Sequence, residues 1–230
     1  MESTKVPVNP VPLEDAEFTP RQNAVLEAAL HLLVEGGGGA LTTARIAKAA
    51  NCSKESLYKW FGDRDGLLAA IIEYQAGKVR LPEAATLPET ARSFRNSLER
   101  FAFDLLSVLS GDVSLALNRL AIGQASREDA HLGTLVLERG RRVIGLRAGA
   151  LLEAGRTKGF IAYDDGEEAF GTLYGLIIRD IHVRRLLGDE SASGNGMLER
   201  QAKKAVEQFF SLYGTAGSSG SELEPVRMNK

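Results

Sequence analysis

The residues between Thr42 and Arg64 combine basic, hydroxyl and phenolic side chains in a spacing that suits contact with nucleic acid. Five basic residues stand there against two acidic residues, a local excess of three positive charges in a chain whose formal net charge is −2. Cationic side chains bind DNA phosphates and release counterions, and hydroxyl groups can donate hydrogen bonds to phosphate oxygens. A charged run can equally be a solvated helix face, so the elements that carry these side chains decide between the two interpretations.

Two short helices joined by a tight turn are expected to carry these side chains. Thr42 or Thr43 caps the first helix, the turn lies at Asn51-Cys52, and Ser53 caps the second helix. A longer helix precedes them, opened by a capping box over residues 19–22 with proline at its first position. Two short helices covered by a longer one form the arrangement of a DNA-reading helix-turn-helix.

The second short helix, through Phe61, divides its side chains between core and DNA. Leu57 and Phe61 lie four residues apart and can face the core. The start of such a helix enters the major groove, where Lys54, Glu55 and Ser56 can reach base edges and set the sequence preference. The residues that we expect to contact DNA are Thr42, Thr43, Arg45, Ser53, Lys54, Glu55, Ser56, Tyr58, Lys59 and Arg64.

Three residues of this segment also have interpretations that involve no DNA. Tyr58 is either a phosphate contact or a core aromatic residue whose hydroxyl group reaches the surface. Trp60 is expected to pack in the core rather than to stack on a base. Cys52, the single cysteine, is expected to be an inert packing residue, because a redox sensor requires an exposed and electropositive thiol.

The rest of the chain is expected to be helical. Apolar residues recur at helical spacing, no segment alternates as a strand does, and 230 residues suffice for a core without disulfide or metal. Further caps are expected at residues 86–89 and 164–167. The fold is therefore predicted to be all-α, with about nine helices. We divide it into a flexible tail at 1–18, a three-helix helix-turn-helix domain at 19–80, a larger helical domain at 81–213 and a disordered tail at 214–230.

The sequence contains no recognisable catalytic, metal or cofactor site. His31, His131 and His182 do not follow metal-ligand spacing, and a single cysteine excludes a multi-cysteine zinc site. Paired acids such as Asp164-Asp165 read as helix-start charges. No apolar run reaches the roughly 18 residues of a membrane span, and the N-terminus does not resemble a signal peptide. We therefore expect a cytoplasmic protein that is not an enzyme, has no cofactor and has no membrane partner.

The run from Thr42 to Phe61, with Asp63-Arg64-Asp65-Gly66-Leu67-Leu68 after it, resembles the DNA-binding domain of the TetR family. That family combines a threonine-rich start, an Ile-Ala pair, a Gly-Val-Ser turn, a Leu-Tyr-x-x-Phe segment and a Lys-Asp/Glu-x-Leu start of the fourth helix. The resemblance covers about a quarter of the chain. The C-terminal half is similar to the AefR-type subgroup in its length, helical layout and the stretch Leu115–Gln124.

The chain departs from the family pattern at four positions. Asn51 replaces the turn glycine, and asparagine is the next-best residue for a left-handed conformation. Cys52 replaces the valine, and Arg64 replaces a lysine while keeping its charge. Ala44 stands where some members carry a base-reading arginine, which puts a base contact by the neighbouring Arg45 in doubt.

The resemblance implies a repressor that binds a palindromic double-stranded DNA operator as a homodimer and is released by a small-molecule effector. The domain at 81–213 would then bind the effector and dimerise. Two apolar stripes, with Gly171 and Gly175 one turn apart, suggest the dimer interface. The candidate interface residues are Phe170, Tyr174, Ile177, Ile178, Ile181, Ala202, Val206 and Phe209. Polar residues within apolar segments are the candidates for effector contacts: Asn118, Arg119, Tyr174, Arg179 and His182.

Two other functions remain compatible with the sequence. A helical enzyme or scaffold without DNA binding would need a catalytic or binding constellation in the second half, and none is recognisable there. A DNA-binding activator without an effector would need no ligand cavity, so a largely apolar cavity would argue against it.

Overall fold

The computed structural model describes residues 18–80, 88–126 and 131–216. Within them the secondary structure is helical, apart from an isolated bridge between Ile161 and Gly214, which confirms the predicted all-α class. The α-helices are α1 Pro20–Gly36, α2 Thr43–Ala49, α3 Lys54–Phe61, α4 Arg64–Gly77, α5 Ala91–Ser110, α6 Asp112–Gln124, α7 His131–Leu135, α8 Arg142–Thr157, α9 Gly166–Ile178, α10 Ile181–Leu186 and α11 Asn195–Tyr213. A π-helical segment, Val136–Arg141, joins α7 and α8 into one continuous helical rod. With α7 and α8 counted together, the described residues form ten helices, where about nine were predicted.

Most of the side-chain caps that the sequence predicts are present in the structure. Thr19 and Gln22 form a complete capping box at α1, and Asp165 accepts hydrogen bonds from two backbone N–H groups at the start of α9. Of the cap predicted at residues 86–89, residues 86 and 87 lie outside the described residues, and residues 88 and 89 are not helical. Helix α5 begins only at Ala91, because Thr90 and Ser93 form a reciprocal capping box there.

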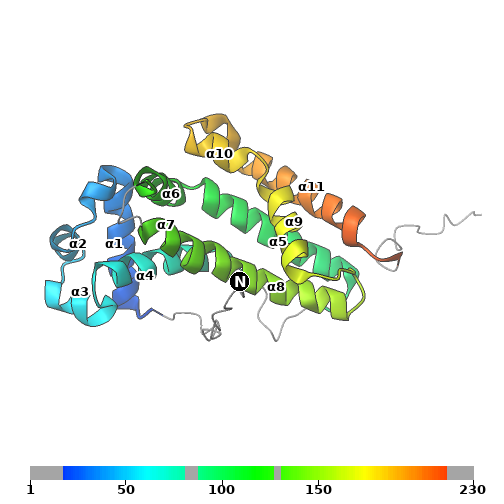
Figure 1. Cartoon of the computed structure of the whole chain (residues 1–230), viewed down its shortest axis with the longest axis horizontal. Helices are drawn as coiled ribbons and strands as arrows, with labels where there is room; N and C mark the ends of the chain where they lie inside the picture. Colours follow the sequence, from blue (N-terminus) through cyan, green and yellow to red (C-terminus); the bar gives the residue numbers. More distant parts are fainter. Residues whose placement is uncertain (1–17, 81–87, 127–130, 217–230) are drawn as a thin grey trace, which may run out of the picture.

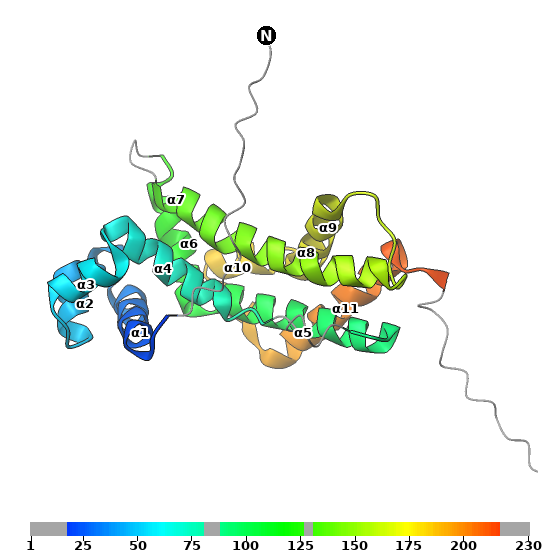
Figure 2. The ribbon, with the colours of Figure 1, turned by 90° about the horizontal axis from the view of Figure 1, so that it is seen from below.

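The molecule is elongated, with α1, α2 and α3 gathered at one end and α5, α8, α9 and α11 at the other (Figure 1). We call α1–α4 the reading head. Helix α4 connects the reading head to the rest of the molecule and lies beside the rod formed by α7, the π-helical segment and α8 (Figure 2). Helix α6 packs against α1, so the C-terminal half touches the reading head through two separate contacts.

Two hydrophobic cores stabilise the fold, and each contains side chains from both sides of the predicted domain boundary at residue 80. The reading-head core, built on α1–α4, also contains Leu117 and Ala121 of α6 and Leu132 and Leu135 of α7. The C-terminal core includes Ala76 from the end of α4, together with Val79 just after it. The domain boundary at 80/81 remains a prediction, and side chains from both sides of it pack in the same cores.

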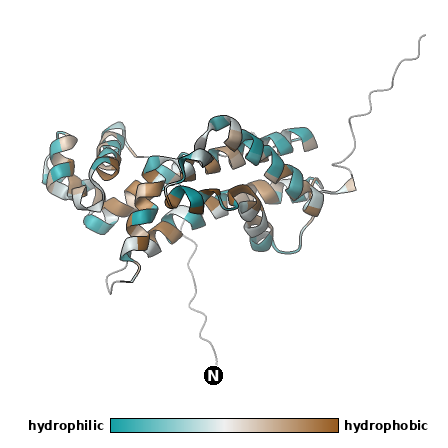
Figure 3. Ribbon diagram, turned by 90° about the horizontal axis from the view of Figure 1, so that it is seen from above, coloured by the Kyte–Doolittle hydropathy of each residue, from teal (hydrophilic) through white to brown (hydrophobic). Residues whose placement is uncertain are grey.

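Aromatic rings fill much of the C-terminal core. Phe94, Phe101 and Phe209 are fully buried, and hydrophobic residues concentrate on the faces that the helices turn toward one another (Figure 3). Gly155 of α8 permits this packing, since a Cβ atom at that position would lie 2.2 Å from Cζ of Phe94. The interior of this half is therefore closely packed between α5, α8 and α11.

The predicted tails need small corrections where the structure describes them. Most of both tails, residues 1–17 and 217–230, lies outside the described residues. Phe18, assigned to the N-terminal tail, packs its ring against Phe61 and Tyr74 with centroid distances of 6.5 and 6.4 Å. Thr215, assigned to the C-terminal tail, donates a hydrogen bond of 2.6 Å to the carbonyl of Gly159. Both residues belong to the folded part.

A helix that crosses a membrane must be both long enough and sufficiently apolar. Within the described residues no single helix meets both requirements. Helices α5 and α6 meet them only when they are taken together, and a bend of 60° separates the two.

Candidate nucleic-acid interface

Hydroxyl side chains fix the starts of α2 and α3, as predicted. The side chain of Thr42 accepts a hydrogen bond of 3.3 Å from the backbone N–H of Arg45. Ser53 accepts one of 3.0 Å from the N–H of Ser56, and the two serine hydroxyl groups lie 2.9 Å apart. These bonds satisfy backbone donors that a helix start leaves free. Ser53 therefore caps α3, and its predicted contact with DNA would be a second role.

The turn between α2 and α3 keeps its shape without the family's glycine. Asn51 has φ 48°, the left-handed conformation that asparagine was predicted to supply. Arg21 of α1 braces this turn, since its guanidinium donates to the carbonyls of Ala50 (3.1 Å) and Asn51 (2.6 Å). Sequence reasoning missed Arg21, whose partners lie about thirty residues away. Cys52 is half-buried against the reading-head core, as expected of a packing residue.

Helix α3 separates its faces as predicted. Leu57 and Phe61 are only 2% and 8% exposed, whereas Tyr58 is 52% exposed. Lys54, Glu55 and Lys59 are exposed, and Ser56 is half-buried. Trp60 packs against the reading-head core with its ring edge-on to Phe61. The side chains expected to meet DNA are thus accessible, while their contacts with DNA remain a prediction.

Basic side chains gather on the accessible surface of α2, α3 and the start of α4. Five are exposed in this segment: Arg45, Lys48, Lys54, Lys59 and Arg64. Thr43 is half-buried at the first position of α2. The helices that carry these residues lie at one end of the molecule (Figure 1), away from α9 and α11. That end therefore offers a basic surface to a polyanion.

A glycine makes the junction between α3 and α4 possible. Asp63 caps α4 by accepting a hydrogen bond of 2.8 Å from the backbone N–H of Gly66. A Cβ atom at position 66 would lie 2.0 Å from the carbonyl oxygen of Phe61, which is a backbone atom with little freedom to move. Sequence reasoning assigned no role to Gly66. Glycine in the first turn of a helix, where alanine would be more stable, was the available signal.

A charged contact fastens α1 to α4 inside the reading head. The Tyr74 hydroxyl donates a hydrogen bond of 2.5 Å to Glu27, and Lys78 lies 3.4 Å from the same carboxylate. The bond to Glu27 raises the pKa of Tyr74 to about 12, and in turn the bond from Tyr74 holds the pKa of the Glu27 carboxyl below its usual value. Because Lys78 is the residue that follows α4, this contact also fixes how α4 leaves the reading head.

None of the five residues predicted to bind an effector lines the cavity that lies between α1, α4, α5 and α6. Asn118 donates to the carbonyl of Ser114 in its own helix, 2.8 Å away. Arg119 donates to two carbonyls at the end of α10, those of residues 185 and 186, at 2.8 and 3.0 Å. The Tyr174 ring lies under the Arg141 guanidinium at 4.8 Å, and Arg179 is exposed with φ 48° at the end of α9. Their visible roles are structural.

His182, the fifth candidate, joins α10 to α5. Its Nδ1 atom lies 3.2 Å from the carbonyl oxygen of Leu109, and a neutral imidazole protonated at Nδ1 donates a hydrogen bond there. Burial lowers the pKa of the His182 imidazole from its usual value, although the bond to Leu109 opposes that effect. A lowered pKa in the fold means that the unfolded chain takes up a proton first as pH falls.

We therefore expect His182 to make the protein less stable in acid. Its contribution is complete above the unfolded pKa of about 6.5 and is lost as pH falls through the lower folded value. The His182→Asn variant keeps a donor for Leu109 but does not titrate, so its unfolding temperature should fall less between about pH 7.5 and pH 5.5. Thermal melts of both proteins, with exposed His31→Asn as control, measure this difference. If the unfolding temperatures of the parent and His182→Asn fall by the same amount over this pH range, the role of His182 is refuted.

Most of the residues predicted to form the dimer interface are already buried within the single chain, which leaves little of their surface for a partner. Seven of them are at most 8% exposed and pack in the protomer's C-terminal core: Phe170, Ile177, Ile178, Ile181, Ala202, Val206 and Phe209. The eighth, Tyr174, is half-buried beside Phe170. Helices α9 and α11 pack these stripes against each other and against α5, because one chain already supplies complementary apolar faces.

Over residues 18–80, 88–126 and 131–216, no three His, Cys, Asp or Glu side chains are grouped so as to hold a metal ion. The polar groups considered above are instead engaged in caps, turn braces and interhelical contacts.

Two family models match the chain. The model described as "Bacterial regulatory proteins, tetR family" matches residues 25–71, which include α2 and α3. The model described as "AefR-like transcriptional repressor, C-terminal domain" matches residues 96–215, more than half of the chain. The two matches lie on the same segments that the sequence resemblance singled out.

Individual proteins agree with this assignment. A TetR transcriptional regulator from Agrobacterium tumefaciens, known from its crystal structure, is 59% identical, with a TM-score of 0.76 over 88% of this chain and 98% of that chain. The flavonoid-responsive regulator FrrA is 22% identical and shares the fold, with a TM-score of 0.61 over 85% and 98% of the two chains. The uncharacterized HTH-type transcriptional regulator YdeS of Bacillus subtilis (strain 168) is 28% identical over 73% of this chain and 79% of its own. This chain therefore belongs to the TetR family of bacterial transcriptional regulators and carries an AefR-like C-terminal domain.

Proposed function

We propose that this regulator is a repressor that binds a palindromic operator as a homodimer and leaves it when a small-molecule effector binds. The observation that carries the DNA-binding part is the exposed start of α3, with Lys54 and Glu55 accessible on a helix whose back is anchored by Leu57 and Phe61. Repression is the role named for the AefR-like domain that matches the C-terminal half. The proposed site of action is the cytoplasm, where chromosomal DNA is accessible.

The proposed dimer interface is the outward face of α9 and α11. Gly171 and Gly175 are exposed one turn apart on α9, and a Cβ atom on either would meet open space. Leu212 is 65% exposed near the end of α11. The hydroxyl groups of Thr172 and Tyr213 lie 3.2 Å apart, which brings that end of α11 beside this part of α9. Exposed glycines allow two helices to approach closely, and an isologous pair would place two α3 helices about one DNA turn, roughly 34–36 Å, apart.

Effector release requires that the C-terminal half control the orientation of the reading head. The shared cores support this part of the proposal, because α6 and α7 contribute four side chains to the reading-head core. Gly38, at the end of the head nearest α6, adds a close contact: a Cβ atom there would lie 2.3 Å from Cδ1 of Leu120. A shift of α6 would therefore move α1 with it. An effector acts only through its different affinities for the two arrangements.

DNA binding is tested by two substitutions in α3. Lys59→Ala should weaken binding to all sequences and lower the salt dependence by about one counterion, because a phosphate contact carries no sequence information. Lys54→Ala should cost about 1–3 kcal/mol of binding free energy and also relax the sequence preference. The measurements are fluorescence anisotropy with duplex DNA and selection of bound sites from a random pool.

The matched control is Lys158→Ala. Lys158 lies at the end of α8, far from the reading head, and pairs with Glu89 on the surface, so DNA affinity should not change. If the parent protein binds no duplex from the pool at low salt, the proposed function fails. If Lys54→Ala selects the same sites as the parent, Lys54 does not read bases.

A further inference from the structure

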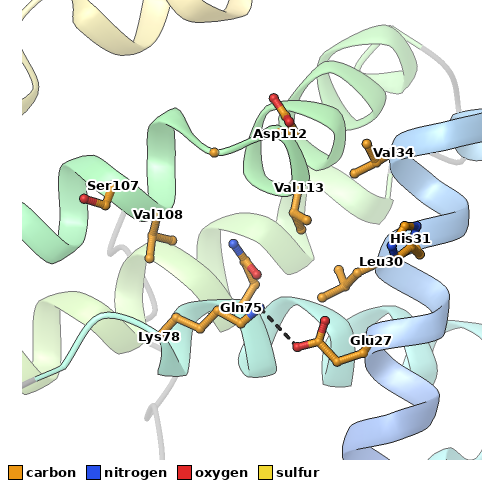
Figure 4. Close-up of a pocket in the computed structure, with 11 residues that line it drawn as sticks. Glu27, Leu30, His31, Val34, Gln75, Lys78, Ser107, Val108, Asp112 and Val113 are labelled. Carbon is orange, nitrogen blue, oxygen red and sulfur yellow. Dashed lines mark hydrogen bonds and ion pairs between the residues drawn. The ribbon is translucent and has the colours of Figure 1, made fainter. Parts of the chain in front are cut away.

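A cavity of about 450 Å³ lies at the joint between the reading head and the C-terminal half. Figure 4 shows its lining side chains, which come from α1 and α4 on one side and from α5 and α6 on the other. That volume falls within the range, roughly 300–1,000 Å³, of sites that hold small organic molecules. The cavity is separate from the predicted DNA-binding residues and from the five predicted effector contacts, none of which lines it.

Two residues that line this cavity each carry a buried polar atom that has no hydrogen-bond partner among the described residues. These atoms are Oε1 of Gln75 and Oγ of Ser107. Gln75 is only 8% exposed, and its Nε2 donates a hydrogen bond of 3.3 Å to Ser114. A buried polar group without a partner destabilises the fold, so such groups are retained where something else supplies the bond. A hydroxyl group both donates and accepts, and it therefore suits Gln75 in either amide orientation as well as Ser107.

The other lining side chains indicate the polarity and the charge of a suitable ligand. Leu30 and Val34 of α1 face Val108 and Val113 of α5 and α6 across the cavity (Figure 4), which favours an apolar body. The lysine of the lining, Lys78, is already paired with Glu27 at 3.4 Å. The carboxylate of Asp112 adds a second negative charge to the lining, so an anionic ligand would be repelled.

We propose that this joint cavity binds a small uncharged molecule with an apolar, ring-sized body and a hydroxyl group, and that its binding alters the affinity for DNA. The proposal rests on the proposed function, since it identifies where and by what chemistry the effector acts. A ligand here touches α1 and α4 of the reading head and α5 and α6 of the other half at once. It therefore stabilises the one arrangement of the two parts that fits it best.

The test uses 4-fluorophenol as the probe and fluorobenzene as its counterpart without the hydroxyl group, each observed by fluorine NMR with the full-length protein. We expect saturable broadening or a shift of the 4-fluorophenol signal and much weaker binding of fluorobenzene. Ser107→Ala should weaken 4-fluorophenol binding roughly five-fold, the loss expected for one hydrogen bond. Ser97→Ala, on the same helix but bonded to its own backbone, is the matched control and should bind like the parent.

A second variant fills the cavity without disturbing the core. Val34 is 44% exposed, so Val34→Trp can place its ring in the cavity while the protein stays folded; Leu146→Trp, at a position 47% exposed on α8, is the control. We expect Val34→Trp alone to abolish probe binding. Absence of binding to the parent, or binding that neither Ser107→Ala nor Val34→Trp weakens, overturns the site.

Coupling to DNA is measured separately, by anisotropy at saturating 4-fluorophenol. A change in DNA affinity that disappears in Val34→Trp supports the proposal. Probe binding with unchanged DNA affinity overturns the coupling. Should the probe-free protein bind no DNA at all, the proposed function fails, while the fluorine NMR series still decides whether the cavity binds hydroxylated rings.

Discussion

Gly66→Ala is expected to destabilise the protein by about 1–3 kcal/mol, the usual cost of forcing an extra methyl group into a packed site. The added Cβ atom would lie 2.0 Å from the backbone oxygen of Phe61, so either the end of α3 or the start of α4 must move. Because α3 carries the side chains expected to read bases, DNA affinity should fall together with stability. Chemical denaturation and DNA anisotropy on the same variant measure both effects.

Gly77→Ala is the matched control for that experiment. Gly77 is the last residue of the same helix, and a Cβ atom there would have no neighbour within 4 Å. Alanine is favoured over glycine in a helix by roughly 0.5–1 kcal/mol, so this variant should be as stable as the parent or more so. Equal stability of Gly66→Ala and the parent would show that the junction between α3 and α4 adjusts freely.

Gly171→Arg is expected to convert the proposed dimer into a monomer and to weaken operator binding about a hundred-fold or more, because two linked half-sites bind far more tightly than one. The arginine would project from the exposed face of α9 at a point where the structure leaves open space. Arginine is also a better helix former than glycine, so the protomer should remain folded. Light scattering coupled to size exclusion and DNA anisotropy check the two effects.

Gly149→Arg on α8 is the control, since a Cβ atom at that helical glycine also meets open space. It should remain a dimer with the DNA affinity of the parent. A dimeric Gly171→Arg protein would exclude this face of α9 as the interface. If Gly149→Arg alone is monomeric, the interface includes α8.

Features fixed by neighbouring residues were predictable from the sequence. Ser53 and Asp63 cap their helices at the predicted positions, and Asn51 adopts the left-handed conformation that its side chain tolerates. Such caps and turns depend on residues two to four positions apart, so the sequence contains all the information they need. The helix-turn-helix and the separation of its two faces follow from these local features.

Features that depend on distant residues were not predictable in the same way. An apolar stripe such as that of α9 shows that a face is buried but not which neighbour buries it, and Phe170 and Ile177 pack in the core of their own protomer. Arg119 stands within apolar sequence because it binds carbonyls 66 and 67 residues away. The joint cavity also escaped prediction, because four helices from both halves supply its walls.

The shared cores limit how pieces of such proteins can be exchanged. A reading head cut at residue 80 would lose Leu117 and Ala121 of α6 and Leu132 and Leu135 of α7, which complete its interior. The remaining half would lose Ala76 and Val79 from its own core. A chimeric regulator that joins this head to another member's C-terminal domain must therefore transplant the matching surfaces of α6 and α7 along with it. The two cores are thus built from segments that interleave along the chain.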